Sequence, residues 1–135
     1  MRRLCILLLL LCLLPSCESV PKNLIEITPD LVITDSREQT LSFSVYPNSA
    51  SSVELLPAKS DAGNYETYMQ NDDKGEKTRH ISGDWFHIVS LNSTAIEVNI
   101  KENTSEALRR LTFKCERQAG EAEVVIIQQG KEYEN

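Results

Sequence analysis

The sequence predicts an all-β sandwich. Apolar residues recur at every second position through most of the chain, which is the spacing of residues on one face of a β-strand. Clusters of Pro, Gly, Asn, Asp and Ser separate these segments about every eight to twelve residues, as turns between short strands do. No stretch has convincing helical periodicity, although residues 105–110 have room for one helical turn. This pattern and the chain length favour an immunoglobulin-like antiparallel β-sandwich of about seven strands.

The first half of the domain opens with an interrupted strand. Residues 24–27 and 31–34 are apolar segments on either side of Pro29, and they indicate a split first strand or a tight pair. Alternation of apolar residues with Thr and Ser over residues 40–45 predicts a strand with one buried and one solvated face. A brief strand is expected over residues 53–56, where a proline stops it.

The middle of the chain is less regular. Residues 58–83 are polar and charged, with turn signals at residues 61–64 and 71–75. We expect a hairpin or a long surface excursion here, with one strand near residues 65–69.

Regular alternation returns in the second half. It predicts strands over residues 85–91, 96–100, 111–115 and 122–129. The last of these contains an unbroken Val-Val-Ile-Ile run. Such a run indicates burial on both faces or a packed central position in a sheet.

The N-terminus predicts export and lipidation. Two arginines and an apolar run over residues 4–14 precede a Leu-Pro-Ser-Cys ending, the pattern of a secretory signal. This ending resembles the lipobox of bacterial lipoproteins, which implies cleavage after Ser16 and lipidation of Cys17. An uncleaved anchor is the alternative, but the run is shorter than the roughly 20 residues that a spanning helix needs. The expected organisation is a signal peptide at 1–16, a lipidated tether at 17–23, one sandwich domain at 24–131 and a tail at 132–135.

Charge and cysteine content narrow the possible partners. The formal net charge is −6, and loss of two arginines with the signal peptide would make the mature chain more acidic. An acidic surface argues against nucleic acid and anionic lipid as partners. After processing, Cys115 would be the remaining free thiol, and its alternation phase places it in the core as a small hydrophobe.

The chain has few candidates for catalysis. His80 and His87 have no recognisable catalytic context, and we expect them at surface or edge positions. The acidic segment 72–76 lacks the alternating spacing of a calcium loop, so a solvated turn is expected. We therefore predict a protein that is not an enzyme, with no cofactor and no metal site.

Aromatic residues are the candidates for sugar binding, because a pyranose stacks its apolar face on an exposed ring. The candidates are Tyr65, Tyr68 and Trp85. Trp85 suits the core of a small sandwich better than its surface. Tyr65 and Tyr68 are an odd number of positions apart, so in one strand they would face opposite sides. Polar neighbours within residues 64–72 make the excursion the best place for a ligand surface.

Motifs in the second half suggest a family. These are Gly-Asp-Trp-Phe at 83–86, Glu-Asn-Thr-Ser at 102–105 followed by Arg109, and Gln-x-Gly at 128–130. Together they resemble the BACON domain of Bacteroidetes lipoproteins and glycan-utilisation proteins, most closely over residues 85–130. The resemblance implies a carbohydrate-binding sandwich domain.

The motif residues also have structural explanations. Asn103 suits a corner between strands because its side chain bonds its own backbone two residues on. Arg109 is within reach of Glu102 or Glu106, and Gln128 is suited to satisfying backbone groups where the last strand meets an edge. Gly130 would release the chain from the sheet.

Two functions remain open from the sequence. The first is a lipid-anchored glycan-binding or adhesion module at the bacterial outer membrane, on its surface or its periplasmic side. The second is a structural spacer or a protein-interaction subunit of an envelope assembly without sugar affinity. An exposed aromatic on the excursion would favour the first, and an acidic surface with an open edge strand the second. The oligomeric state is left open.

Lipidation can be tested directly. In a bacterial host that processes lipoproteins, the chain should incorporate a labelled fatty acid and fractionate with membranes, and Cys17→Ala should abolish both. Cys115→Ala is the control and should still be labelled. Labelling that survives Cys17→Ala would contradict the prediction.

Overall fold

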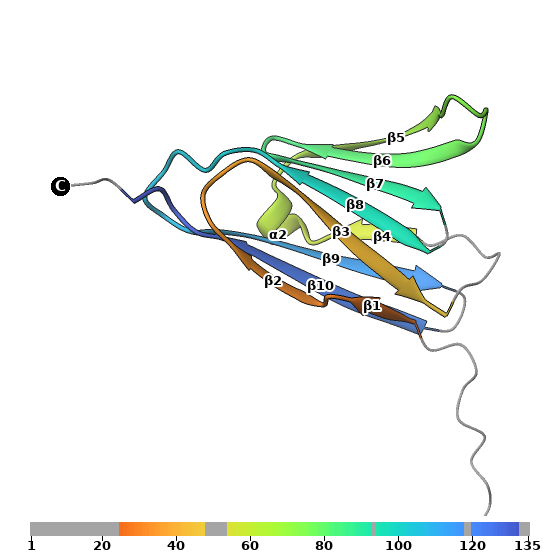
Figure 1. The fold of residues 1–135 in the computed structure, drawn as a ribbon, viewed down its shortest axis with the longest axis horizontal. Helices are drawn as coiled ribbons and strands as arrows, with labels where there is room; N and C mark the ends of the chain where they lie inside the picture. Colours follow the sequence, from red (N-terminus) through yellow and green to blue (C-terminus); the bar gives the residue numbers. More distant parts are fainter. Residues whose placement is uncertain (1–24, 48–53, 93, 118–119, 133–135) are drawn as a thin grey trace, which may run out of the picture.

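The computed structural model describes residues 25–47, 54–92, 94–117 and 120–132, which form a two-layered β-sandwich (Figure 1). The predicted all-β sandwich is therefore confirmed. Residues 1–24 lie outside the described part of the chain, and with them the predicted signal peptide, Cys17 and the tether. No helix in the described segments is long and apolar enough to cross a membrane.

The first sheet has six strands, all antiparallel to their neighbours. In spatial order they are β1 (Glu26–Thr28), β3 (Gln39–Tyr46), β8 (Ala95–Ile100), β7 (Phe86–Asn92), β6 (Lys77–Gly83) and β5 (Tyr65–Asn71).

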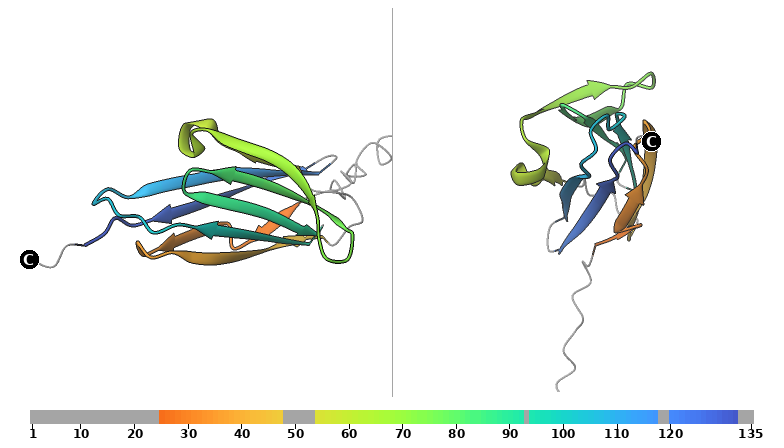
Figure 2. Two further views of the ribbon diagram at one scale, coloured as in Figure 1. Left: turned by 90° about the horizontal axis from the view of Figure 1, so that it is seen from above. Right: turned by 90° about the vertical axis from the view of Figure 1, so that its left-hand side faces the viewer.

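The second sheet has four strands, and a single turn of helix, α2 (Lys59–Ala62), connects it to the first. Its order is β2 (Leu31–Thr34), β10 (Gly120–Gln128), β9 (Arg109–Arg117) and β4 (Glu54–Pro57). β2 runs parallel to β10, and the other pairs are antiparallel. The two further views in Figure 2 show the sheets as separate layers.

The strand count is higher than predicted, with ten strands in the described residues in place of about seven. One reason is that the interrupted first strand is split between the layers: at Pro29 the chain leaves β1 in the first sheet and enters β2 in the second. A second reason is that residues 58–83 form α2 and a complete β5–β6 hairpin. The parallel β2–β10 pair corrects the expectation of a wholly antiparallel sandwich, and residues 105–110 form bends and the start of β9 in place of a helical turn.

The core lies between the sheets and is built from the inward side chains of alternating strands. Phe43 of β3 meets Phe113 of β9 edge-on, with ring centroids 5.9 Å apart, and so joins the two layers. Cys115 is fully buried as predicted, and burial raises the pKa of its thiol to about 12. In the described residues, every member of the core cluster lies between Ile25 and Ile126, so residues 19–135 contain this cluster.

The Val-Val-Ile-Ile run lies in β10, an interior strand of the second sheet. This confirms the predicted central position in a sheet. Val124 and Ile126 point inward and are fully buried. Val125 and Ile127 are only half-buried on the outer face, so burial on both faces is wrong.

A buried side-chain amide joins the two sheets at the end of β10. The fully buried Gln128 donates from Nε2 to the carbonyl oxygens of Ser36, Arg37 and Lys101, at 3.2, 3.1 and 3.0 Å. Its Oε1 accepts from Arg109 Nε at 2.8 Å. Arg109 also donates to the Lys101 carbonyl, so its partners are these groups and not Glu102 or Glu106 as expected.

The neighbouring corner depends on Asn103 and Gly130. Asn103 accepts from Ser105 N at 3.2 Å, the local bond predicted for it, and donates to the carbonyls of Ala107 and Gln129. Gly130 does more than release the chain, because a Cβ at this position would overlap the Glu106 carbonyl.

Replacing Gln128 by leucine should reduce the free energy of unfolding by roughly 2–4 kcal/mol, because it leaves buried carbonyl groups without donors. Chemical denaturation of residues 19–135 measures this. Gln129→Ala is the matched control, since this side chain is exposed, and it should change stability by less than about 0.5 kcal/mol. Equal stability of the two variants would contradict the role assigned to Gln128.

Candidate functional site

The three aromatic candidates do not form one platform. Tyr65 and Tyr68 lie on opposite faces of β5, as their spacing predicted. Tyr65 packs against the core, whereas the Tyr68 side chain is 42% exposed on the outer face of the first sheet. Tyr68 is therefore the candidate that solvent can reach most readily.

Trp85 lies in the turn between β6 and β7 and is partly buried against the core, close to the role expected for it. The guanidinium carbon of Arg109 sits 4.3 Å from the centre of its ring, and the Phe86 ring meets it edge-on. Because Arg109 covers one ring face, Trp85 belongs to the structural network around Gln128.

Tyr68 is one of three nearly parallel rings that cluster on the outer face of the first sheet, with His80 and His87. His80 lies directly opposite it on β6, with ring centroids 5.0 Å apart and planes 7° from parallel. His87 on β7 lies edge to edge with His80, with ring centroids 5.1 Å apart and planes 19° from parallel. Both histidines are half-buried on interior strands, with their rings on the outer surface of the sheet. Of the two predicted positions, surface or edge, the surface position is the one found.

Hydrogen bonds fix the tautomers of the two imidazoles. The Thr78 hydroxyl donates to the Gln70 carbonyl at 3.1 Å, so it can only accept from His80 Nε2 at 2.9 Å. His80 Nδ1 is then an acceptor, and His87 Nε2 donates to it across 3.0 Å. In this arrangement His80 is a donor to Thr78 and does not act as a base toward it.

A hollow of about 450 Å³ opens beside these rings, between the tip of the β5–β6 hairpin and the outer side of β7. We call it the outer hollow. Its lining residues are Gln70, Asn71, Asp72, Lys74, Glu76, Thr78, His80, Val89 and Leu91. Apolar side chains come from β7, and amide, carboxylate and ammonium groups come from the hairpin, a mixture suited to a polar ligand with an apolar face.

The hairpin turn holds the polar wall in place. Asp72 Oδ1 accepts from the backbone N of Lys74 at 2.9 Å and of Glu76 at 2.8 Å, while Gly75 takes a φ of +79°. The predicted turn at residues 72–76 is confirmed. Among the described residues, no group of three His, Cys, Asp or Glu side chains is arranged to hold a metal ion.

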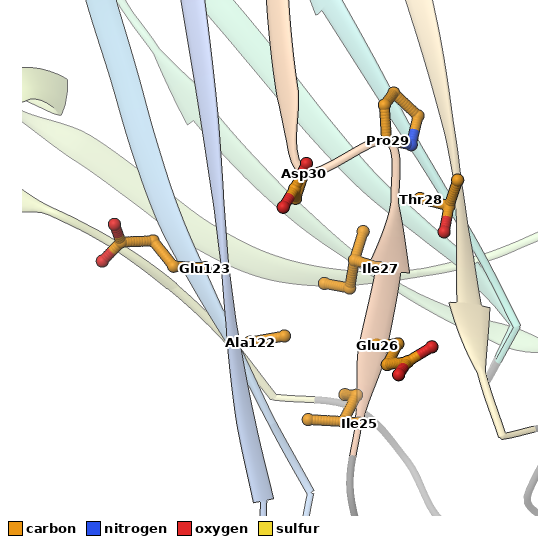
Figure 3. Close-up of a pocket in the computed structure, with 8 residues that line it drawn as sticks. All are labelled: Ile25, Glu26, Ile27, Thr28, Pro29, Asp30, Ala122 and Glu123. Atoms are coloured by element: carbon orange, nitrogen blue, oxygen red, sulfur yellow. The ribbon is translucent and has the colours of Figure 1, made fainter.

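A second depression, the side groove, lies where β1 and the first half of β10 face each other across the open side of the sandwich (Figure 3). Its volume is about 440 Å³. It is lined by Ile25, Glu26, Ile27, Thr28, Pro29, Asp30, Ala122 and Glu123. None of the three predicted aromatic residues lines it.

The comparisons with known proteins give the fold and no family. No protein-family profile matches the chain, and no curated protein matches it. A solved structure of a protein from Bacteroides thetaiotaomicron matches with a TM-score of 0.57 and 13% identity, over 85% of this chain and 97% of that one. A Bacteroides ovatus GH5 xyloglucanase, solved with a XXXG heptasaccharide, matches with a TM-score of 0.50 and 8% identity. That match covers 79% of this chain and 19% of the xyloglucanase, and at such identities both likenesses show a shared fold alone.

The sequence singled out Tyr68 and the polar residues around it but missed the histidine pair. The signal was present: His80 and His87 lie either side of the Gly-Asp-Trp turn in two adjacent strands. Because Ser82 pairs with His87, and His80 is two residues before Ser82, the two rings are diagonal neighbours on one face. The strand over residues 77–83 had to be recognised before this could be seen.

The histidine pair predicts a pH dependence of stability. Burial, and then the charge of His87, lower the pKa of His80 below the ordinary 6.5. The unfolded chain therefore binds a proton at this residue at higher pH than the folded protein, so stability should fall as the pH drops through 6.5 toward the lowered value. Thermal unfolding between pH 7.5 and 5.5 measures this, and His80→Gln should flatten the curve. A slope that His80→Gln leaves unchanged would contradict the assignment.

Proposed function

We propose that the chain is a non-catalytic, lipid-anchored, BACON-like module that binds glycans through the outer face of its first sheet. The observation that carries the proposal is the exposed Tyr68 ring beside the outer hollow. The lipid anchor on Cys17 and a place at the bacterial outer membrane rest on the signal sequence. No cofactor is part of the proposal, and neither is a nucleic-acid partner.

The ring contact with His80 supports a sugar-binding role for Tyr68. Its ring packs nearly parallel to that of His80, with centroids 5.0 Å apart, so the ring is held in place while the residue stays 42% exposed. A ring fixed in advance loses little conformational entropy when a ligand stacks on it. The apolar face of a pyranose is a suitable ligand for such a surface.

The outer hollow supports the same role, because hydrogen-bonding groups line it on the same face of the sheet as the Tyr68 ring. Gln70 and Asn71 carry amides, and Asp72 and Glu76 carry carboxylates, which together both donate to and accept from sugar hydroxyls. Two carboxylates beside a single ammonium, that of Lys74, favour an uncharged sugar over a uronic acid or a sulfated one.

A spacer or protein-interaction subunit is the second candidate. It is favoured by the open edges of both sheets and by the acidic chain. The likeness to a segment of a xyloglucanase is compatible with either role, since at 8% identity it carries the fold alone.

Glycan-array binding of residues 19–135 tests the proposal. Across host, plant and microbial glycans, binding should be reproducible and should weaken at least about tenfold in Tyr68→Ala, because a central aromatic anchor is lost. Tyr46→Ala is the matched control, since Tyr46 is 68% exposed on the same sheet but lies on β3, away from the outer hollow. Tyr65→Ala and Trp85→Ala should mainly lower stability, because both rings pack against the core.

Absence of binding by the folded protein across the array would refute the proposal and leave the spacer or interaction role. Equal loss in Tyr68→Ala and Tyr46→Ala would also count against it, because the site would then lie elsewhere on the sheet.

A further inference from the structure

The geometry points to the side groove as a docking site for an extended peptide strand that carries alternating apolar and basic side chains. The partner would be a protein segment that adds to the second sheet beside the first half of β10. This surface is separate from the outer hollow and independent of the proposed sugar binding.

The second sheet lacks half a strand at this place. β2 pairs with β10 only from Val125 to Gln128, because the residues before Pro29 belong to β1 in the first sheet. In the described residues, the first half of β10 has β9 on one side and no strand on the other. An added strand here would continue the line of β2.

The backbone of this half-strand is directed toward the gap. Val125 N donates to the Asp30 carbonyl and Gln129 N to the Thr34 carbonyl, both at 2.9 Å. Odd-numbered residues of β10 therefore aim their N–H and C=O groups toward the β2 side. By the same alternation Glu121 and Glu123 aim theirs into the open gap, which gives a ladder to pair with.

The side chains around the gap select the chemistry of the added strand. Figure 3 shows Ile25 and Ile27 pointing toward β10 and Ala122 pointing toward β1, so residues that point inward would meet an apolar floor. The Glu123 side chain points to the opposite, outer side. An added strand would place its outward residues beside Glu121 and Glu123, where opposite charge is favourable across strands.

Local charge is predominantly negative around the site. Glu26 and Asp30 line the groove together with Glu123. Lys114 lies on the outer face beside these groups: its Nζ is 3.7 Å from Glu121, and it pairs across strands with Glu123. One ammonium among four carboxylates leaves the site attractive to lysine or arginine.

Synthetic hexapeptides test the inference by NMR titration of residues 19–135, which contain the core cluster of the described residues. A peptide of alternating lysine and valine should bind saturably and shift the amide signals of Ile27, Glu121 and Glu123. A glutamate–valine peptide should not bind, and neither should a lysine–valine peptide with a central proline, which cannot donate to the ladder. Glu123→Lys should weaken binding at least tenfold, whereas Glu54→Lys, an exposed glutamate on the far edge strand β4, should not.

Hydrogen exchange of the free protein gives an independent reading. The amides of Glu121 and Glu123 should exchange much faster than those of Val125 and Gln129, which have partners in β2 and the residues around it. Equal protection would overturn the inference, because the ladder would already be filled. Equal binding of the proline peptide would also overturn the inference, because it would show that charge attraction alone holds the peptide. A lysine–valine peptide that does not bind saturably would overturn it as well.

Discussion

The amide of Gln128 is the interaction on which the arrangement of this sandwich depends. A single buried side chain satisfies carbonyls from the segment after β2 and the segment after β8, and it holds Arg109 by its remaining oxygen. Arg109 in turn covers Trp85, which packs on the core of the first sheet. The two layers are thus joined at one end by directional bonds as well as by apolar contact. Buried hydrogen-bonded groups of this kind favour one arrangement over its alternatives, because any other leaves polar atoms unsatisfied.

The strand pattern was largely predictable because inward residues alternate with outward ones along most strands. The alternation identified β3 and β8 to within one residue at each end, and β9 to within two. What failed was the assignment of partners: the break at Pro29 was visible, but not that the chain changes sheets there. Pairing between strands far apart in the sequence depends on the whole fold, and a local period carries no information on it. The same limit explains why β2 was not expected to run parallel to β10.

The candidate site was predictable in part. Tyr68 and its polar neighbours stood out by residue type, and the odd spacing from Tyr65 correctly separated the two rings onto opposite faces. The histidines became informative only when two strands were placed side by side, since their contact is diagonal across the β6–β7 pair. Arg109 shows the converse error. Acidic residues close in sequence suggested ion pairs for Arg109. In the folded chain its partners are the Lys101 carbonyl, the Gln128 amide oxygen and the Trp85 indole ring.

Because Cys115 is buried between the sheets, its reactivity reports on separation of the two sheets. The thiol is buried between the two sheets, and burial raises its pKa to about 12. In the native state it is therefore neither accessible to a reagent nor ionised at neutral pH. An alkylating reagent would then modify this residue only in molecules whose sheets have separated. The rate of modification would follow the population of that open form when closing is fast, and the rate of opening when it is slow. Transient separation of the two sheets could then be measured as covalent modification of Cys115.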